Sequence, residues 1–305
     1  ARAHHKMIGR ERSISAPLCT IVIVCLCTLI QLWAFFWEPD LDHYALSAQR
    51  IYYDWQFHRL FSAAFFHVGW VHLILNMMST LAIQSWLEKA LGSVLTMCLV
   101  LWSVVLSGLL SVSMLFVVAG LTGKHHYRYD QSLGYSAVLF SMAVVESHLS
   151  DLTTRSVFGF FSVPSKAYPW ILLIIIQLCF PHVSFTGHLG GALSGLLLSL
   201  GGAKWIMPGS RFVQDYVDPR LSHISTFVAC PNDPWPDERA SCVDMTREVA
   251  GGISTAAVGV YHILTDCFGC NRPGPDGQYP DGDERQTLII RDGRLTRTNN
   301  GSSEV

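Results

Sequence analysis

Six apolar runs alternate with polar loops along the first two-thirds of the chain. They cover residues 17–37, 68–87, 94–121, 133–145, 168–180 and 185–206. A transmembrane helix needs about 20 mostly apolar residues, and four of the runs reach that length. The runs at 133–145 and 168–180 are short, which is tolerated where neighbouring helices shield them and the bilayer thins locally. The pattern predicts an all-α polytopic membrane protein with six transmembrane helices.

The segments that flank these runs predict the domain organisation. Residues 1–15 are basic, so the positive-inside rule places the N-terminus in the cytoplasm. The first run ends in an aromatic belt at residues 33–37, which indicates a retained helix rather than a cleaved signal peptide. We therefore expect a six-helix domain at residues 16–206. Six crossings return residues 207–305 to the cytoplasm as a polar tail, which we expect to be largely disordered.

Composition supports a membrane environment. Half of the residues are hydrophobic and only 14% are charged, whereas soluble domains average about 25% charged residues. The net charge of -2 argues against a nucleic-acid partner, because phosphate binding needs a basic surface. Five cysteines lie in apolar runs and are expected to be buried. The four tail cysteines are irregularly spaced and do not predict a zinc site, which leaves lipid attachment or free thiols open.

Polar side chains inside the apolar runs are the informative ones, because an ionisable group at mid-bilayer usually faces a cavity or a partner. His72 and Asn76 are four residues apart and project from one helical face. They either hold the bundle together through interhelical hydrogen bonds or supply donors that stabilise an oxyanion.

Ser136 opens the fourth run in the sequence Gly134-Tyr135-Ser136-Ala137. A serine in a membrane helix most often bonds its own backbone or packs at a close helix contact. At a helix N-terminus it can instead act as a nucleophile, because the free N–H groups stabilise nearby negative charge. The G-x-S-x-G motif of soluble hydrolases is absent, since position 138 is Val.

His188 lies in the sixth run and shares a helical face with Gly191 and Gly195. Glycines on one face let a neighbouring backbone approach closely. If the fourth helix packs there, His188 can reach Ser136. Structural hydrogen bonding of the histidine is the alternative.

Together, a serine, a base and two oxyanion donors are what acyl transfer requires. No carboxylate is evident in these runs, so the interpretation is a dyad whose base is oriented by packing. Phe140, one turn after Ser136, is positioned to offer a ring face to the imidazole. The chemistry needs no metal and no organic cofactor.

The motifs resemble the rhomboid family of intramembrane serine proteases over residues 16–206. They occur in the family's order as Arg59 and His67 before the second helix, His72-xxx-Asn76, Glu88-xxx-Gly92-Ser93, Gly134-Tyr135-Ser136 and His188-xx-Gly191-xxx-Gly195. The stretches at 133–148 and 160–180 are similar to the six-helix branch that contains rhomboid-related protein 4.

The resemblance implies that Ser136 is the nucleophile and His188 the general base, with His72, Asn76 and the Ser136 N–H binding the oxyanion. The residues expected to support the site by packing are Ala137, Phe140, Gly134, Gly191, Gly195 and Arg59. Two departures concern rate and substrate choice. Ala137 stands where the family often has Gly, and His58 precedes Arg59 where the family has Trp.

The expected function is cleavage of transmembrane segments in other membrane proteins. The alternative is a non-catalytic relative that binds membrane proteins for quality control, although such relatives typically lose the serine or the histidine. A transporter would be expected to show an inverted repeat, and none is visible. The resemblance favours an endomembrane location, in the endoplasmic reticulum or Golgi, with both termini cytoplasmic.

Overall fold

The computed structural model describes residues 17–202, 207–231, 288–291 and 294–297. The basic N-terminal segment and most of the tail therefore lie outside the described residues. The chain divides into two compact units, Ala1–Ala256 and Ala257–Val305. In the second unit, β5 (Leu288–Arg291) pairs antiparallel with β6 (Arg294–Arg297).

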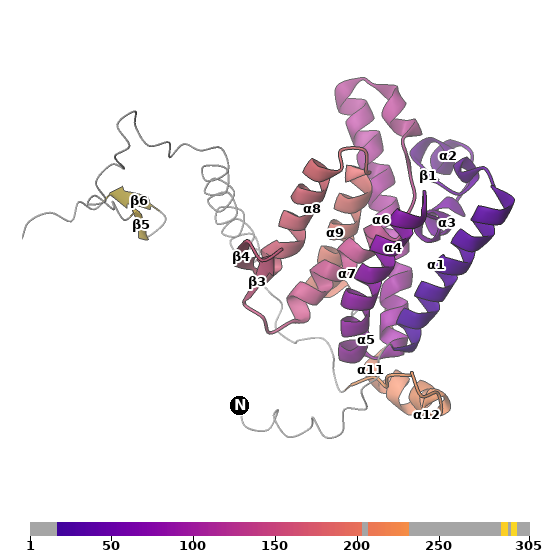
Figure 1. Ribbon diagram of the computed structural model, residues 1–305, viewed down its shortest axis with the longest axis vertical. Helices are drawn as coiled ribbons and strands as arrows, with labels where there is room; N and C mark the ends of the chain where they lie inside the picture. The colour runs from indigo at the N-terminus through magenta and orange to yellow at the C-terminus, as the bar shows by residue number, and fades with distance from the viewer. Residues whose placement is uncertain (1–16, 203–206, 232–287, 292–293, 298–305) are drawn as a thin grey trace, which may run out of the picture. The chain divides into compact units, whose positions relative to one another are not determined.

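The first unit is mostly helical (Figure 1). Among the described residues, α1 (Leu18–Trp37) and α6 (Ser93–Thr122) are long and apolar enough to cross a membrane. A third span is possible if the pair Arg59–Phe65 and Trp70–Leu91, bent by 92°, counts as one. The remaining apolar helices are shorter. They are α7 (Ser136–Leu149), α8 (Tyr168–Cys179) and α9 (Phe185–Leu197).

The helix that contains His72 and Asn76 begins abruptly after the bend. It runs through α4 (Trp70–Ser79), a π-turn at Thr80–Gln84 and α5 (Ser85–Leu91). It contacts α1 on one side and α7 on the other, whereas α9 packs against α6 and α7 (Figure 1). Helices α4 and α9 thus both pack against α7, and α6 packs against α7 and α9.

The first loop folds into short elements. They are a 3₁₀ turn at Leu41–His43, β1 (Leu46–Ser47), α2 (Ala48–Tyr53) and α3 (Arg59–Phe65). β1 pairs antiparallel with β2 (Gln131–Ser132), which follows a 3₁₀ turn at His125–Tyr129. This ladder ties the loop to the segment that leads into α7.

A hairpin joins α7 to α8. Its strands are β3 (Thr154–Val157) and β4 (Phe161–Pro164), followed by a 3₁₀ turn at Ser165–Ala167. Arg155 on β3 pairs with the buried carboxylate of Glu146 near the end of α7. The pair fixes the hairpin against the bundle.

Glu88 caps the N-terminus of α1 from a distant part of the chain. Its carboxylate accepts the Cys19 and Thr20 backbone N–H groups at 2.7 and 2.8 Å and the Ser93 hydroxyl at 2.6 Å. These N–H groups have no partner within the helix, and a carboxylate also favours the positive end of the helix dipole. The Glu88-xxx-Gly92-Ser93 turn therefore holds α1, α5 and α6 together.

Residues 207–231 belong to the folded unit, beyond the expected end of the domain at residue 206. They form α11 (Ser210–Phe212), a π-turn at Val213–Val217 and α12 (Asp218–Leu221). After these elements, the Thr226 carbonyl accepts a hydrogen bond from the Leu18 N–H. The Val228 N–H donates to the Ser93 hydroxyl, and the Val228 carbonyl accepts from the Ser93 N–H. Figure 1 shows this segment beneath the ends of α1 and α5.

Candidate active site

Ser136 is the first residue of α7 and follows a tight turn. Gly134 has φ +121°, a conformation that favours glycine, and its N–H donates to the Ala63 carbonyl at 2.8 Å. The Tyr135 N–H donates to His67 Nε2 at 3.4 Å, and the Tyr135 hydroxyl donates to Gln84 at 2.9 Å. The turn is thus held to α3, the following loop and the π-turn, which presents Ser136 at the end of the helix.

His188 comes from the first turns of α9. The Ser184 side chain caps this helix by accepting the Gly187 N–H at 3.1 Å. His188 Nε2 and Ser136 Oγ lie 2.9 Å apart, within hydrogen-bond distance. The histidine is buried, whereas Ser136 is partly exposed. The two residues, 52 positions apart, therefore form one hydrogen-bonded pair.

Glycines on α9 make this approach possible. A Cβ on Gly191 would meet the Ala137 carbonyl group, with the carbon at 2.8 Å, and a Cβ on Gly195 would meet the Ser141 backbone. A Cβ on Gly190, on another face, would lie 2.8 Å from the Ser107 carbonyl oxygen of α6. Helices α7 and α9 are therefore in backbone contact on the face that carries His188.

Packing surrounds the imidazole of His188. The ring of Phe140 lies 4.8 Å from it between centroids, tilted by 37°. Among the described residues, no hydrogen bond joins His188 to a carboxylate. The ring is thus oriented by its contact with Phe140 and by its bond to Ser136.

His72 lies beside the serine turn and Asn76 bonds the His72 backbone, and neither side chain is hydrogen-bonded to Ser136 in the part of the chain that the structure describes. A Cβ on Gly134 would lie 2.8 Å from His72 Nε2 and 3.6 Å from Nδ1, so the imidazole packs against this glycine through the edge that carries Nε2. Asn76 Nδ2 donates to the His72 carbonyl at 2.8 Å, and its Oδ1 is buried with no hydrogen-bond partner in the described part of the chain. The second N–H of the amide makes no hydrogen bond among the described residues.

Arg59 lies apart from this group. Its side chain is buried and donates to Gln56 Oε1 and the Ala45 carbonyl, both at 2.7 Å, and to the Asp42 carbonyl. It stabilises the first loop and does not contact the Ser136–His188 pair. Within the described ranges, no group of three His, Cys, Asp or Glu side chains is arranged to hold a metal ion.

Sequence reasoning missed the polar groups that join the helices around the site. Ser103 of α6, Ser141 of α7 and Ser194 of α9 are fully buried, with Ser141 Oγ 2.9 and 3.5 Å from the other two hydroxyls. Gln84, which anchors the Tyr135 hydroxyl, was also missed. Each is one of several small or uncharged polar residues in an apolar run, and nothing in the sequence singles it out from the others.

Known proteins are similar to the part of the chain that contains the Ser136–His188 pair. The family profile described as Rhomboid domain matches residues 54–205. Rhomboid-like protein 15 of Arabidopsis thaliana is 38% identical over 222 residues, which cover 70% of this chain and 54% of that protein. Rhomboid-related protein 4 of Mus musculus is 34% identical over 189 residues, 60% of this chain and 59% of that protein.

A relative from Debaryomyces hansenii carries the name Rhomboid-type serine protease 2. It is 30% identical over 171 residues, which cover 53% of this chain and 56% of that protein. The chain thus spans a little over half the length of the curated relatives that it matches.

Proposed function

The chain belongs to the rhomboid family and is an integral membrane protein, and on that premise we propose that it is an intramembrane serine endopeptidase. The observation that carries the proposal is the 2.9 Å separation of His188 Nε2 and Ser136 Oγ inside an apolar helix bundle. A serine at its ordinary pKa is a weak nucleophile, and an adjacent imidazole that takes its proton makes it reactive.

The reaction follows from the positions of these groups. Nε2 removes the hydroxyl proton as Oγ attacks the scissile carbonyl, and the imidazolium then gives this proton to the leaving amine. The carbonyl oxygen becomes negative beside the α7 N-terminus, where the Ser136 N–H, His72 and the free Asn76 N–H are the proposed donors. In the second half of the reaction, His188 removes a proton from water, which attacks the acyl-enzyme. The imidazolium then returns the proton to Ser136 Oγ as the second product leaves.

Substrates of the proposed enzyme are membrane proteins, the class on which this family acts. A helical substrate hides its carbonyls in hydrogen bonds, so segments that contain Gly or Pro unwind most easily and are the expected targets. Helices α7, α8 and α9 are apolar but short, and we propose that they cross a locally thinned bilayer, giving six crossings with both termini cytoplasmic.

The test is cleavage in proteoliposomes. The purified chain is reconstituted with a transmembrane substrate that carries a Gly-rich segment, and wild type is compared with Ser136→Ala and His188→Ala. Ser113→Ala is the matched control, because Ser113 is exposed on α6 and bonds only the Leu109 carbonyl. Wild type and Ser113→Ala should cleave, and the other two variants should not.

Two results would contradict the proposal. Cleavage that survives Ser136→Ala or His188→Ala excludes the dyad. Absence of cleavage by folded wild type, with substrate still bound, favours the non-catalytic binder.

Location and orientation have their own test. We propose an endomembrane protein, to be examined by imaging of the tagged chain, for which mitochondrial signal would be the contrary result. The sequon at Asn300 should stay unglycosylated, since the proposed orientation keeps it in the cytoplasm.

A further inference from the structure

Gln31 is a polar residue on the buried face of α1 that the dyad does not use. It follows Cys19, Ile23 and Cys27 at four-residue spacing on that face, and its side chain is only 8% exposed. Its Oε1 is shielded from solvent and has no hydrogen-bond partner among the described residues. Buried acceptors are rarely left unpaired in folded proteins, so this oxygen needs a donor.

His67 presents the complementary group. It is 2% exposed, and its Nε2 accepts the Tyr135 N–H in the turn before Ser136. A neutral imidazole that accepts at Nε2 carries its proton on Nδ1. Nδ1 is also buried, with no partner that meets hydrogen-bond geometry in the described part of the chain, although the Phe65 backbone interacts with the ring.

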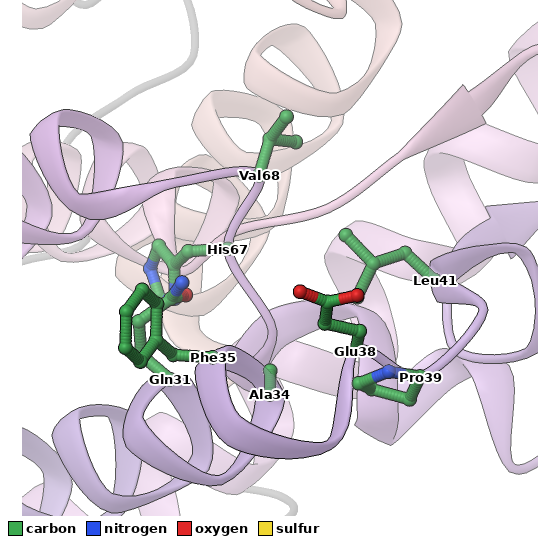
Figure 2. A pocket seen from close by; sticks show the side chains of 8 residues that line it. All are labelled: Gln31, Ala34, Phe35, Glu38, Pro39, Leu41, His67 and Val68. Atoms are coloured by element: carbon green, nitrogen blue, oxygen red, sulfur yellow. The ribbon is translucent and has the colours of Figure 1, made fainter.

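Both side chains line one pocket of about 290 Å³ between the end of α1 and the loop that leads into α4. Figure 2 shows them on the same side of this pocket, beside Phe35, with Glu38 on the opposite side. Gln31 Oε1 has no donor among the described residues, and His67 Nδ1 has beside it only the Phe65 backbone interaction. Both atoms are closed to water-sized probes, so a rotation of the Gln31 amide toward the ring is the movement that joins them.

We propose that Gln31 and His67 form a hydrogen-bonded relay that positions the turn carrying Ser136. Gln31 Oε1 accepts the Nδ1 proton, which fixes the tautomer in which Nε2 accepts the Tyr135 N–H. The predicted effect of the relay on kcat rests on the proposed function. The hydrogen bonds of the relay do not, because they stabilise the folded chain whether or not it is an enzyme. His67 is a positioning residue, acting through the backbone beside the nucleophile, and Gln31 acts through His67.

The two amide substitutions of His67 separate its two nitrogens. His67→Gln places an acceptor near Nε2, and His67→Asn places a polar group near Nδ1 and loses the acceptor. Kinetics in proteoliposomes should show kcat lowered about fivefold by His67→Asn, with KM unchanged and most of the rate recovered in His67→Gln, as expected for loss of one hydrogen bond.

Gln31→Met tests the other end of the relay. It should lower kcat about threefold in the wild-type background and have no further effect in the His67→Gln background, which has no tautomer to fix. Leu29→Met is the matched control, because Leu29 is 63% exposed on the same helix.

Hydrogen exchange of the Tyr135 amide gives a readout that does not require activity. Exchange should be slow in wild type and His67→Gln and faster in His67→Asn and Gln31→Met. If wild type does not cleave its substrate, the proposed function fails and exchange alone decides the relay. Equal exchange in Gln31→Met and wild type, or equal losses of kcat from Gln31→Met in both backgrounds, would overturn the relay.

Discussion

Substituting Gly191 by Ala should separate the Ser136–His188 pair. The added Cβ would lie 2.8 Å from the Ala137 carbonyl carbon and 2.9 Å from its Cα, and nearer still to the carbonyl oxygen. These are rigid backbone atoms of α7, so they do not move aside as the end of a flexible side chain does. One helix must move relative to the other.

The size of the movement sets the expected effect. Ordinary van der Waals contact begins at 3.4 Å. Relieving the contact with the carbonyl carbon alone moves α9 from α7 by about 0.6 Å, and the nearer oxygen requires more. A shift of this size at the dyad, one turn away, stretches the 2.9 Å bond to at least about 3.5 Å, the outer limit of a hydrogen bond. A misplacement of about 1 Å costs about a hundredfold in rate, so we expect kcat to fall at least about tenfold.

The assay measures kcat in proteoliposomes together with the rate of fluorophosphonate labelling and the midpoint of thermal unfolding. Overpacking costs about 1–3 kcal/mol, so the variant should be less stable and still folded. Gly120→Ala is the control, since no atom lies within 4 Å of a Cβ there. Gly191→Ala that is folded and labels and cleaves at the wild-type rate would refute the close-contact argument.

Three further predictions concern other groups. Asn76→Ala should lower kcat about 100-fold or more in the cleavage assay, the usual effect of removing one oxyanion donor, whereas an unchanged kcat would exclude Asn76 from that role. Glu88→Ala should cost about 3 kcal/mol of stability in thermal or denaturant unfolding, because it leaves the α1 N–H groups unpaired, with Glu88→Gln losing less; equal stability of all three would contradict the cap. Burial, with a smaller contribution from Asp218, raises the pKa of the Cys230 thiol to about 11, so its alkylation by iodoacetamide, mapped at Cys230 by mass spectrometry, should rise with pH and remain slow at pH 8 in the folded chain. Fast alkylation of Cys230 in the folded chain at pH 8 would contradict the raised pKa.

The apolar pattern predicted the two longest helices well, because a long run of apolar residues is enough to indicate a membrane-spanning helix. The run at 94–121 corresponds to α6 (Ser93–Thr122), and the run at 17–37 corresponds to α1 (Leu18–Trp37). The family, which the motif order indicated, is confirmed by the profile match. The predicted number of six crossings stays a proposal, because helix length alone supports two or three among the described residues.

Long-range contacts were beyond a local pattern. The sequence marked the segment after residue 206 as polar, yet residues 226–228 bond α1 and Ser93 through their backbone, which any sequence can do. The cap on α1 pairs groups 68 or more positions apart, so no periodicity reports it. The glycines at 191 and 195 indicated a close-contact face, but only the fold shows that α7 is the helix packed there.

The most direct test of the central claim is the site of covalent labelling by a fluorophosphonate, mapped by mass spectrometry on the folded protein in detergent or lipid. A serine reacts with this probe when a neighbouring base activates it. We predict a single adduct on Ser136 in wild type, absent in Ser136→Ala and strongly reduced in His188→Ala. No adduct on Ser136 in folded wild type, or equal labelling in His188→Ala, would contradict the proposed dyad.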